Sequence, residues 1–194
     1  MPWDDAKQEA AERKARNRAT GRKARAKGDR FESVVARAHA RYAAEGRALI
    51  YKRPTPIKPI GPASKGAFRA VWQEKAGCDY GGAVAGGRAV LLEVKSSSAA
   101  SLPLDRGARG PTLAPSQADE LDLADSLGAI AGVLVAVTPA AGVRWFFLPW
   151  RRWCAAVEEA RAAARASLGV ELLERHGFGV PPGDWLAAVD GCGA

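Results

Sequence analysis

The apolar positions along the chain follow two periods, one helical and one strand-like. Residues 30–44 carry apolar or small side chains at helical spacing, from Phe31 to Tyr42. Helices are also predicted over residues 116–127 and 154–176. Short apolar runs predict strands at residues 48–52, 68–74, 79–85, 89–95, 132–138 and 143–148.

The order of these elements predicts the fold class. The run AVLLEVK at residues 89–95 is apolar on both faces until Glu93, as expected of a central strand, and Gly86 and Gly87 predict a hairpin turn before it. A helix, several strands, a helix and two more strands predict an α/β fold with a mixed central β-sheet flanked by helices. The segment GFGVPPGDW at residues 177–185 is expected to be a loosely attached tail.

Composition adds bounds to this picture. With 194 residues, of which 47% are hydrophobic, the chain can form one compact domain with appendages. No apolar run is long enough to cross a membrane and the N-terminus is charged, so we expect a cytoplasmic protein. Three widely spaced cysteines argue against a disulfide framework and a structural zinc site. Two histidines make a His-based metal centre unexpected.

The net charge of +8 is concentrated in two stretches. Residues 1–30 hold ten basic and five acidic residues, and residues 52–75 hold six basic residues against Glu74, so each stretch carries +5 and the rest of the chain carries −2. This distribution favours a polyanionic partner, with nucleic acid as the leading candidate.

Both basic stretches have compositions that predict projecting segments. Residues 1–27 contain almost no apolar side chain larger than alanine, so they are expected to form a mobile basic arm that contacts phosphates; a solvated helix is the alternative. Residues 53–67 contain four prolines and two glycines, which predict a projecting loop because proline disfavours both helix and central strand. Long loops of this kind are usually functional.

Three carboxylates are candidates for chemistry. Glu93 and Lys95 are two apart on a predicted strand, so their side chains leave the same face. The predicted hairpin at Gly86 and Gly87 would bring Asp79 beside Glu93, and two hard oxygen ligands suit Mg²⁺ or Mn²⁺. The alternative is structural: Glu93 and Lys95 form a salt bridge, and Asp79 begins a turn.

Glu32 is the third carboxylate. Asp29 and Glu32 have the spacing of a capping box, in which Glu32 returns to the amide of Asp29 at the start of a helix. The functional interpretation is that Glu32, in the first turn of a helix packed on the sheet, reaches the same metal or its water shell.

These residues together resemble a known family. The order GDRFE (28–32), YKRPTPI (51–57), CDYGG (78–82) and LLEVK (91–95), followed by Gln117 in a helix and a buried strand, resembles the RecU-type Holliday junction resolvases of the PD-(D/E)xK, restriction-endonuclease-like superfamily. The resemblance covers about residues 27–153. It departs from the family at Gly77 and Cys78, where hydroxyl residues are frequent, and at Gly81, where an Asn is frequent.

The resemblance implies a homodimeric, Mg²⁺-dependent endonuclease that cuts four-way DNA junctions, without a small-molecule cofactor and without a membrane. It makes residues 28–153 the nuclease domain, followed by a C-terminal helix and tail at 154–194, and makes the proline-rich loop a stalk that enters the junction. Carried over by motif, the catalytic residues are Glu32, Asp79, Glu93, Lys95 and Gln117. The metal ligands are Asp79, Glu93, the backbone carbonyl of Val94 and, through water, Glu32.

The basic residues around this site are the predicted DNA contacts: Arg25, Lys27, Arg30, Lys52, Arg53, Lys58, Lys65, Arg69 and Lys75. Two other functions stay open. The first is a different PD-(D/E)xK nuclease that acts on duplex or branched DNA, and the second is a non-catalytic DNA-binding protein in which the carboxylates are structural.

Overall fold

The computed structural model describes residues 30–54, 57–64, 67–72 and 77–190. A six-stranded mixed sheet forms its centre, in the order β1-β4-β5-β7-β8-β10. Only β5 and β7 run parallel; the other neighbours are antiparallel. The strands are β1 (Ala48–Lys52), β4 (Tyr80–Val84), β5 (Ala89–Ser96), β7 (Ile130–Val137), β8 (Arg144–Pro149) and β10 (Phe178–Val180). The predicted α/β fold with a mixed sheet flanked by helices is confirmed.

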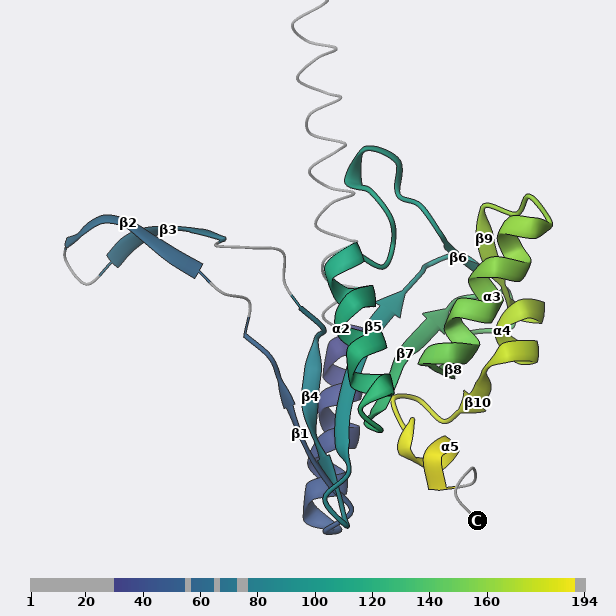
Figure 1. Cartoon of the computed structure of the whole chain (residues 1–194), viewed down its shortest axis with the longest axis horizontal. Helices are drawn as coiled ribbons and strands as arrows, with labels where there is room; N and C mark the ends of the chain where they lie inside the picture. The colour runs from purple at the N-terminus through teal and green to yellow at the C-terminus, as the bar shows by residue number, and fades with distance from the viewer. Residues whose placement is uncertain (1–29, 55–56, 65–66, 73–76, 191–194) are drawn as a thin grey trace, which may run out of the picture.

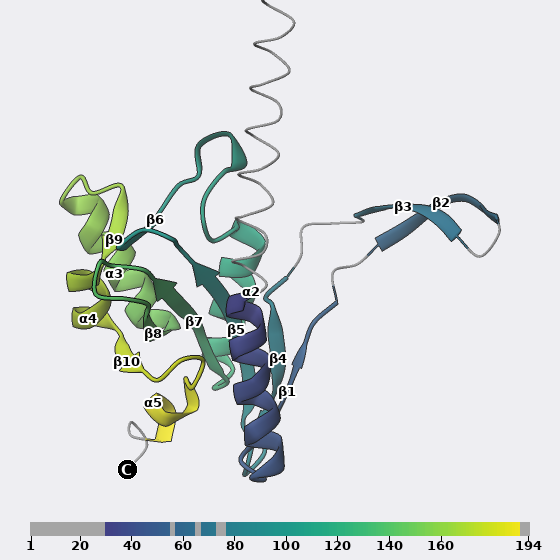
Figure 2. The same cartoon turned by 180° about the vertical axis from the view of Figure 1, so that it is seen from behind.

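Helices cover both faces of this sheet (Figures 1 and 2). A helix over residues 30–44 packs on one face together with α5 (Leu186–Asp190). The other face is covered by α2 (Pro115–Ser126), α3 (Trp150–Ala162) and α4 (Val170–His176). We call the face covered by the helix over residues 30–44 the N-helix face, and the other the α2 face. The alternating side chains of β7 enter both cores, which explains why this strand is apolar throughout.

The proline-rich segment is a β-hairpin, so the prediction of a loop was wrong. β2 (Ile57–Ser64) and β3 (Ala67–Trp72) pair antiparallel, with a register shift between Ile60 and Ser64. A two-stranded ribbon tolerates prolines because each strand has an outer edge that needs no backbone donor. The hairpin leaves the sheet between β1 and β4 and projects away from the body (Figure 1).

The C-terminal region also differs from the prediction. The single helix expected over residues 154–176 is interrupted, because Ala163 ends α3 and β9 (Ser167–Gly169) precedes α4. β9 pairs with β6 (Ser101–Pro103), which comes before the short 3-10 helix η1 (Gly107–Arg109). The expected loose tail supplies the edge strand β10, and its Trp185 is 0% exposed within the core. No helix in the described residues is long and apolar enough to span a bilayer.

Candidate active site

The end of the β4–β5 hairpin brings two acidic residues together. The ladder closes with the pair Tyr80↔Leu92, so Asp79 lies beside Glu93 just beyond it. The backbone N–H of Asp79 donates to Glu93 Oε2 at 3.0 Å, and the N–H of Val94 donates to Asp79 Oδ2 at 2.9 Å. The glycine turn that aligns the strands has positive φ at Gly86 and Gly87, where a side chain would be strained.

Glu93 and Lys95 form a buried ion pair on the α2 face. Lys95 Nζ lies 2.5 Å from Glu93 Oε1, and the side chains are 11% and 2% exposed. Burial raises the pKa of Glu93 to about 7; the Asp79 carboxylate acts in the same direction and the Lys95 ammonium opposes both. A salt bridge between Glu93 and Lys95 was the non-catalytic alternative in the sequence analysis. In the structure this salt bridge forms part of a larger polar cluster.

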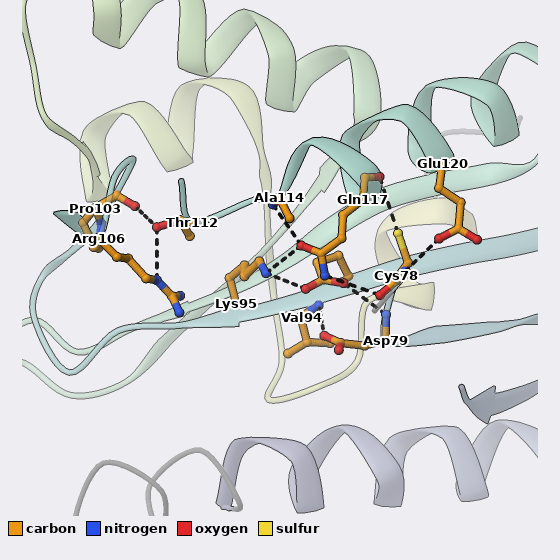
Figure 3. Close-up of polar contacts among 12 residues, drawn as sticks. Cys78, Asp79, Val94, Lys95, Pro103, Arg106, Thr112, Ala114, Gln117 and Glu120 are labelled. Atoms are coloured by element: carbon orange, nitrogen blue, oxygen red, sulfur yellow. Dashed lines mark hydrogen bonds and ion pairs between the residues drawn. The ribbon is translucent and has the colours of Figure 1, made fainter. Parts of the chain in front are cut away.

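Gln117 joins this cluster from the first turn of α2 (Figure 3). Its Oε1 accepts from Lys95 Nζ at 3.2 Å and from the backbone N–H of Ala114 at 3.1 Å. Its Nε2 donates to the Gly77 carbonyl at 3.4 Å. Because both ends of the amide are engaged, Gln117 holds the lysine in a defined position between helix and sheet.

The backbone carbonyl of Val94 faces the same edge of the sheet as the Asp79 carboxylate. The N–H and C=O of one strand residue point to the same side, and the Val94 N–H is bound to Asp79. β4 has ended at this level, so the carbonyl points beyond the last pair of the ladder. An oxygen donor therefore lies next to the two carboxylates.

These groups open onto a cleft of about 720 Å³. The residues that line it are Glu32, Asp79, Glu93, Val94, Lys95, Ser96, Ser97, Ser98, Pro103, Arg106 and Gln117. In the described part of the chain, no three His, Cys, Asp or Glu side chains gather as a metal-binding group. Two carboxylates with a carbonyl oxygen still fit Mg²⁺, which typically binds one or two carboxylates and keeps several waters.

Glu32 lines the cleft from the N-helix face, whereas Glu93 and Lys95 lie on the α2 face. Its carboxylate forms an ion pair with Lys52 of β1, and both side chains are exposed. The capping box proposed with Asp29 lies outside the described residues.

The predicted DNA contacts are only partly described. Arg30 is exposed at the start of the helix over residues 30–44, Lys52 and Arg53 are exposed at the base of the hairpin, and Lys58 and Arg69 belong to β2 and β3. Arg25, Lys27, Lys65 and Lys75 lie outside the described residues. Lys52 and Arg53 are both bound to carboxylates, those of Glu32 and Glu120.

Two residues near the site were missed in the sequence. Glu120 accepts from the backbone N–H of Cys78 at 2.8 Å, and it lies three residues after Gln117, a helical spacing that could have identified it. Arg106 lines the cleft and its Nε donates to Thr112 Oγ1 at 3.3 Å. It lies in an irregular loop where no periodicity points to it. Cys78 is buried, and burial raises the pKa of its thiol.

A family model described as Recombination protein U (RecU) matches residues 26–186. The chain belongs to the RecU family. The match extends past residue 153, where the resemblance ended, and includes the region expected to be a tail. No curated protein matches the chain. Membership of the RecU family implies a recombination-related nuclease that acts on DNA junctions.

Proposed function

We propose that this RecU-family chain is a Mg²⁺-dependent homodimeric endodeoxyribonuclease of the restriction-endonuclease-like fold, which resolves four-way DNA junctions by paired phosphodiester hydrolysis. The observation that carries the proposal is the cluster of Asp79, Glu93, Lys95 and Gln117 near the C-terminal end of β5. Such a cluster, with a buried carboxylate of raised pKa at a cleft, is typical of a catalytic site.

The oxygens of Asp79, Glu93 and the Val94 carbonyl would hold the Mg²⁺. When bound, this ion supplies a coordinated water of lowered pKa and offsets negative charge at phosphorus. Mn²⁺ has similar oxygen preferences and is expected to substitute for it. Glu32, which lines the cleft from the opposite face, would act through water.

Lys95 would stabilise the charge that develops on the phosphate. An ammonium has three N–H donors. Two of those on Lys95 are directed at Glu93 Oε1 and Gln117 Oε1, which leaves the third for a phosphate oxygen or the nucleophilic water. Because Glu93 and Gln117 come from the sheet and from α2, the ammonium is held before substrate binds, and preorganised charge of this kind contributes most to catalysis.

The projecting β2–β3 hairpin would act as the stalk that recognises the open centre of a junction. Its strands carry Lys58 and Arg69, and Lys52 lies at its base. Recognition of shape needs phosphate contacts more than base contacts, which suits a basic ribbon. Two copies related by a two-fold axis would place two sites on the two strands to be cut.

The test is cleavage of a synthetic four-way junction with Mg²⁺. We expect paired nicks, abolished by Asp79→Asn and by Glu93→Gln while junction binding persists. Replacing residues 54–76 by a tight turn, which the pairing of Lys52 with Tyr80 permits, should remove the preference for the junction over linear duplex. Cleavage that persists in both carboxamide variants would refute the site, and equal cutting of linear duplex by the wild type would favour the other nuclease class.

A further inference from the structure

Glu120 of α2 uses both carboxylate oxygens to join two other segments. Its Oε1 lies 2.5 Å from Arg53 Nη1, and its Oε2 accepts from the Cys78 N–H at 2.8 Å. Arg53 follows β1, on the leading leg of the hairpin, and Cys78 lies on the returning leg just before β4. One carboxylate therefore links both legs of the hairpin to the helix that carries Gln117.

The backbone completes this link. The N–H of Arg53 donates to the Asp79 carbonyl at 2.8 Å, so the same residue contacts Glu120 with its side chain and Asp79 with its main chain. Cys78 and Asp79 are thus held from both sides, and the orientation of the Asp79 carboxylate depends on this segment. Figure 3 shows Glu120 directed at Cys78, next to Asp79.

We propose that Glu120 is a positioning residue and that Arg53 and Glu120 form a clamp that fixes the hairpin base and the Asp79 carboxylate relative to each other. The proposal rests on the junction-cleaving function above. It gives Arg53 an intramolecular role in place of the predicted DNA contact, since Arg53 Nη1 lies 2.5 Å from Glu120 Oε1.

Gly77 supplies an independent observation. A Cβ built on Gly77 would lie 2.6 Å from Glu120 Oε2 and 3.2 Å from Arg53 Nη1, so the ion pair occupies the space of a missing side chain. Both contacted atoms are ends of flexible side chains, so an alanine there would displace the pair and leave the fold intact. Gly77→Ala therefore breaks the clamp without changing either charged residue.

The experiment compares Arg53→Ala, Glu120→Ala, Gly77→Ala and the Arg53→Ala/Glu120→Ala double variant with the wild type. Asp119→Ala is the control, since Asp119 is an exposed carboxylate next to Glu120 on α2. Each clamp variant should lower the single-turnover cleavage rate at saturating junction about 10- to 100-fold, as expected for a misplaced catalytic group. Glu120→Gln, which keeps an oxygen for the Cys78 N–H, should lose less than Glu120→Ala.

Three further readouts separate a clamp from a phosphate contact. The junction Kd and its salt dependence should stay unchanged in every variant, whereas loss of a phosphate contact would reduce the slope of log K against log salt by about 1. The double variant should be no slower than the slower single variant. Amide exchange at Cys78, measured without DNA or metal, should accelerate about tenfold or more in Glu120→Ala.

A reduced salt slope in Arg53→Ala alone, with a wild-type rate at saturation, would overturn the clamp. So would unchanged amide exchange at Cys78 in Glu120→Ala. If the wild type and the Asp119→Ala control fail to cut junctions, the proposed function fails instead, and the exchange measurement still tests the clamp on its own.

Discussion

The two faces of the sheet each carry a Glu–Lys pair at the same end, and the pairs differ in burial. Glu93 and Lys95, on the α2 face, are 2% and 11% exposed, whereas Glu32 and Lys52, at the N-helix face, are 50% and 58% exposed. Water screens the exposed pair, so Glu32 and Lys52 can separate and contact other groups at little cost in free energy. The buried pair cannot separate without leaving a buried charge without its partner. One face thus holds its charges in place, and the other can rearrange them when a ligand arrives.

The largest expected effect is on the buried pair. Lys95→Met should lower the free energy of unfolding by about 3 kcal/mol, because Glu93 then remains buried without its cation. Urea denaturation without divalent cations measures this loss. A loss below about 1 kcal/mol would show that the buried pair is no more important for stability than the exposed one.

An effect of nearly the same size is expected from His39 on the N-helix face. His39 is buried against Tyr42, Tyr80 and Trp185, and its Nε2 accepts from Trp185 Nε1. Burial lowers the pKa of His39 to about 4. The unfolded chain takes up a proton near pH 6.5, before the folded one does, so stability is lost as the pH falls from 6.5 to 4.

The measurement is the difference in unfolding free energy between the wild type and His39→Gln across this range, in which the other titrating groups cancel. We expect the difference to fall by about 3 kcal/mol between pH 7.5 and pH 4. A constant difference would mean that the pKa of His39 is the same in the folded and the unfolded chain.

A smaller effect on stability, that of Mg²⁺ binding, should show which face of the sheet supplies the direct metal ligands. Mg²⁺ at tenfold its Kd should stabilise the protein by about 1.4 kcal/mol, since it binds only the folded site. Thermal unfolding with and without Mg²⁺ should show this shift in the wild type and in Glu32→Gln, but not in Asp79→Asn. Loss of the shift in Glu32→Gln would mean that both faces supply direct ligands.

The smallest effect is expected at the exposed pair. Lys52→Met should change the free energy of unfolding by less than about 0.5 kcal/mol, because solvent screens the interaction with Glu32. The same urea measurement provides the value. A change as large as that of Lys95→Met would contradict the contrast between the faces.

The sequence predicted the part of the site that depends on local pattern. The strand holding Glu93 and Lys95 was found because AVLLEVK is apolar on both faces, and Asp79 was placed beside Glu93 by the turn at Gly86 and Gly87. The prediction that both residues of the ExK motif share a face follows from the period of a strand. Periodicity and turn chemistry act over a few residues, so these relations are readable along the chain.

Other features depend on contacts between distant residues. Trp185 was assigned to a tail because GFGVPPGDW contains turn residues, yet it donates to His39, 146 residues away, and is fully buried. The β2–β3 hairpin was missed because prolines count against a strand in a sheet but not in an isolated ribbon. Glu120 was missed because its partners, Arg53 and Cys78, lie 67 and 42 residues away along the chain.

The insertion of the hairpin between two paired strands makes its length adjustable. Lys52 and Tyr80 face each other at its base, so the hairpin connects β1 and β4 as a long turn would. The length of the hairpin therefore does not change the register between β1 and β4. Adding two residues to each strand would move the tip outward by about 6.6 Å and keep the same faces, because side chains repeat every two residues. The reach of the hairpin from the cleft can therefore change without altering the cluster of Asp79, Glu93, Lys95 and Gln117.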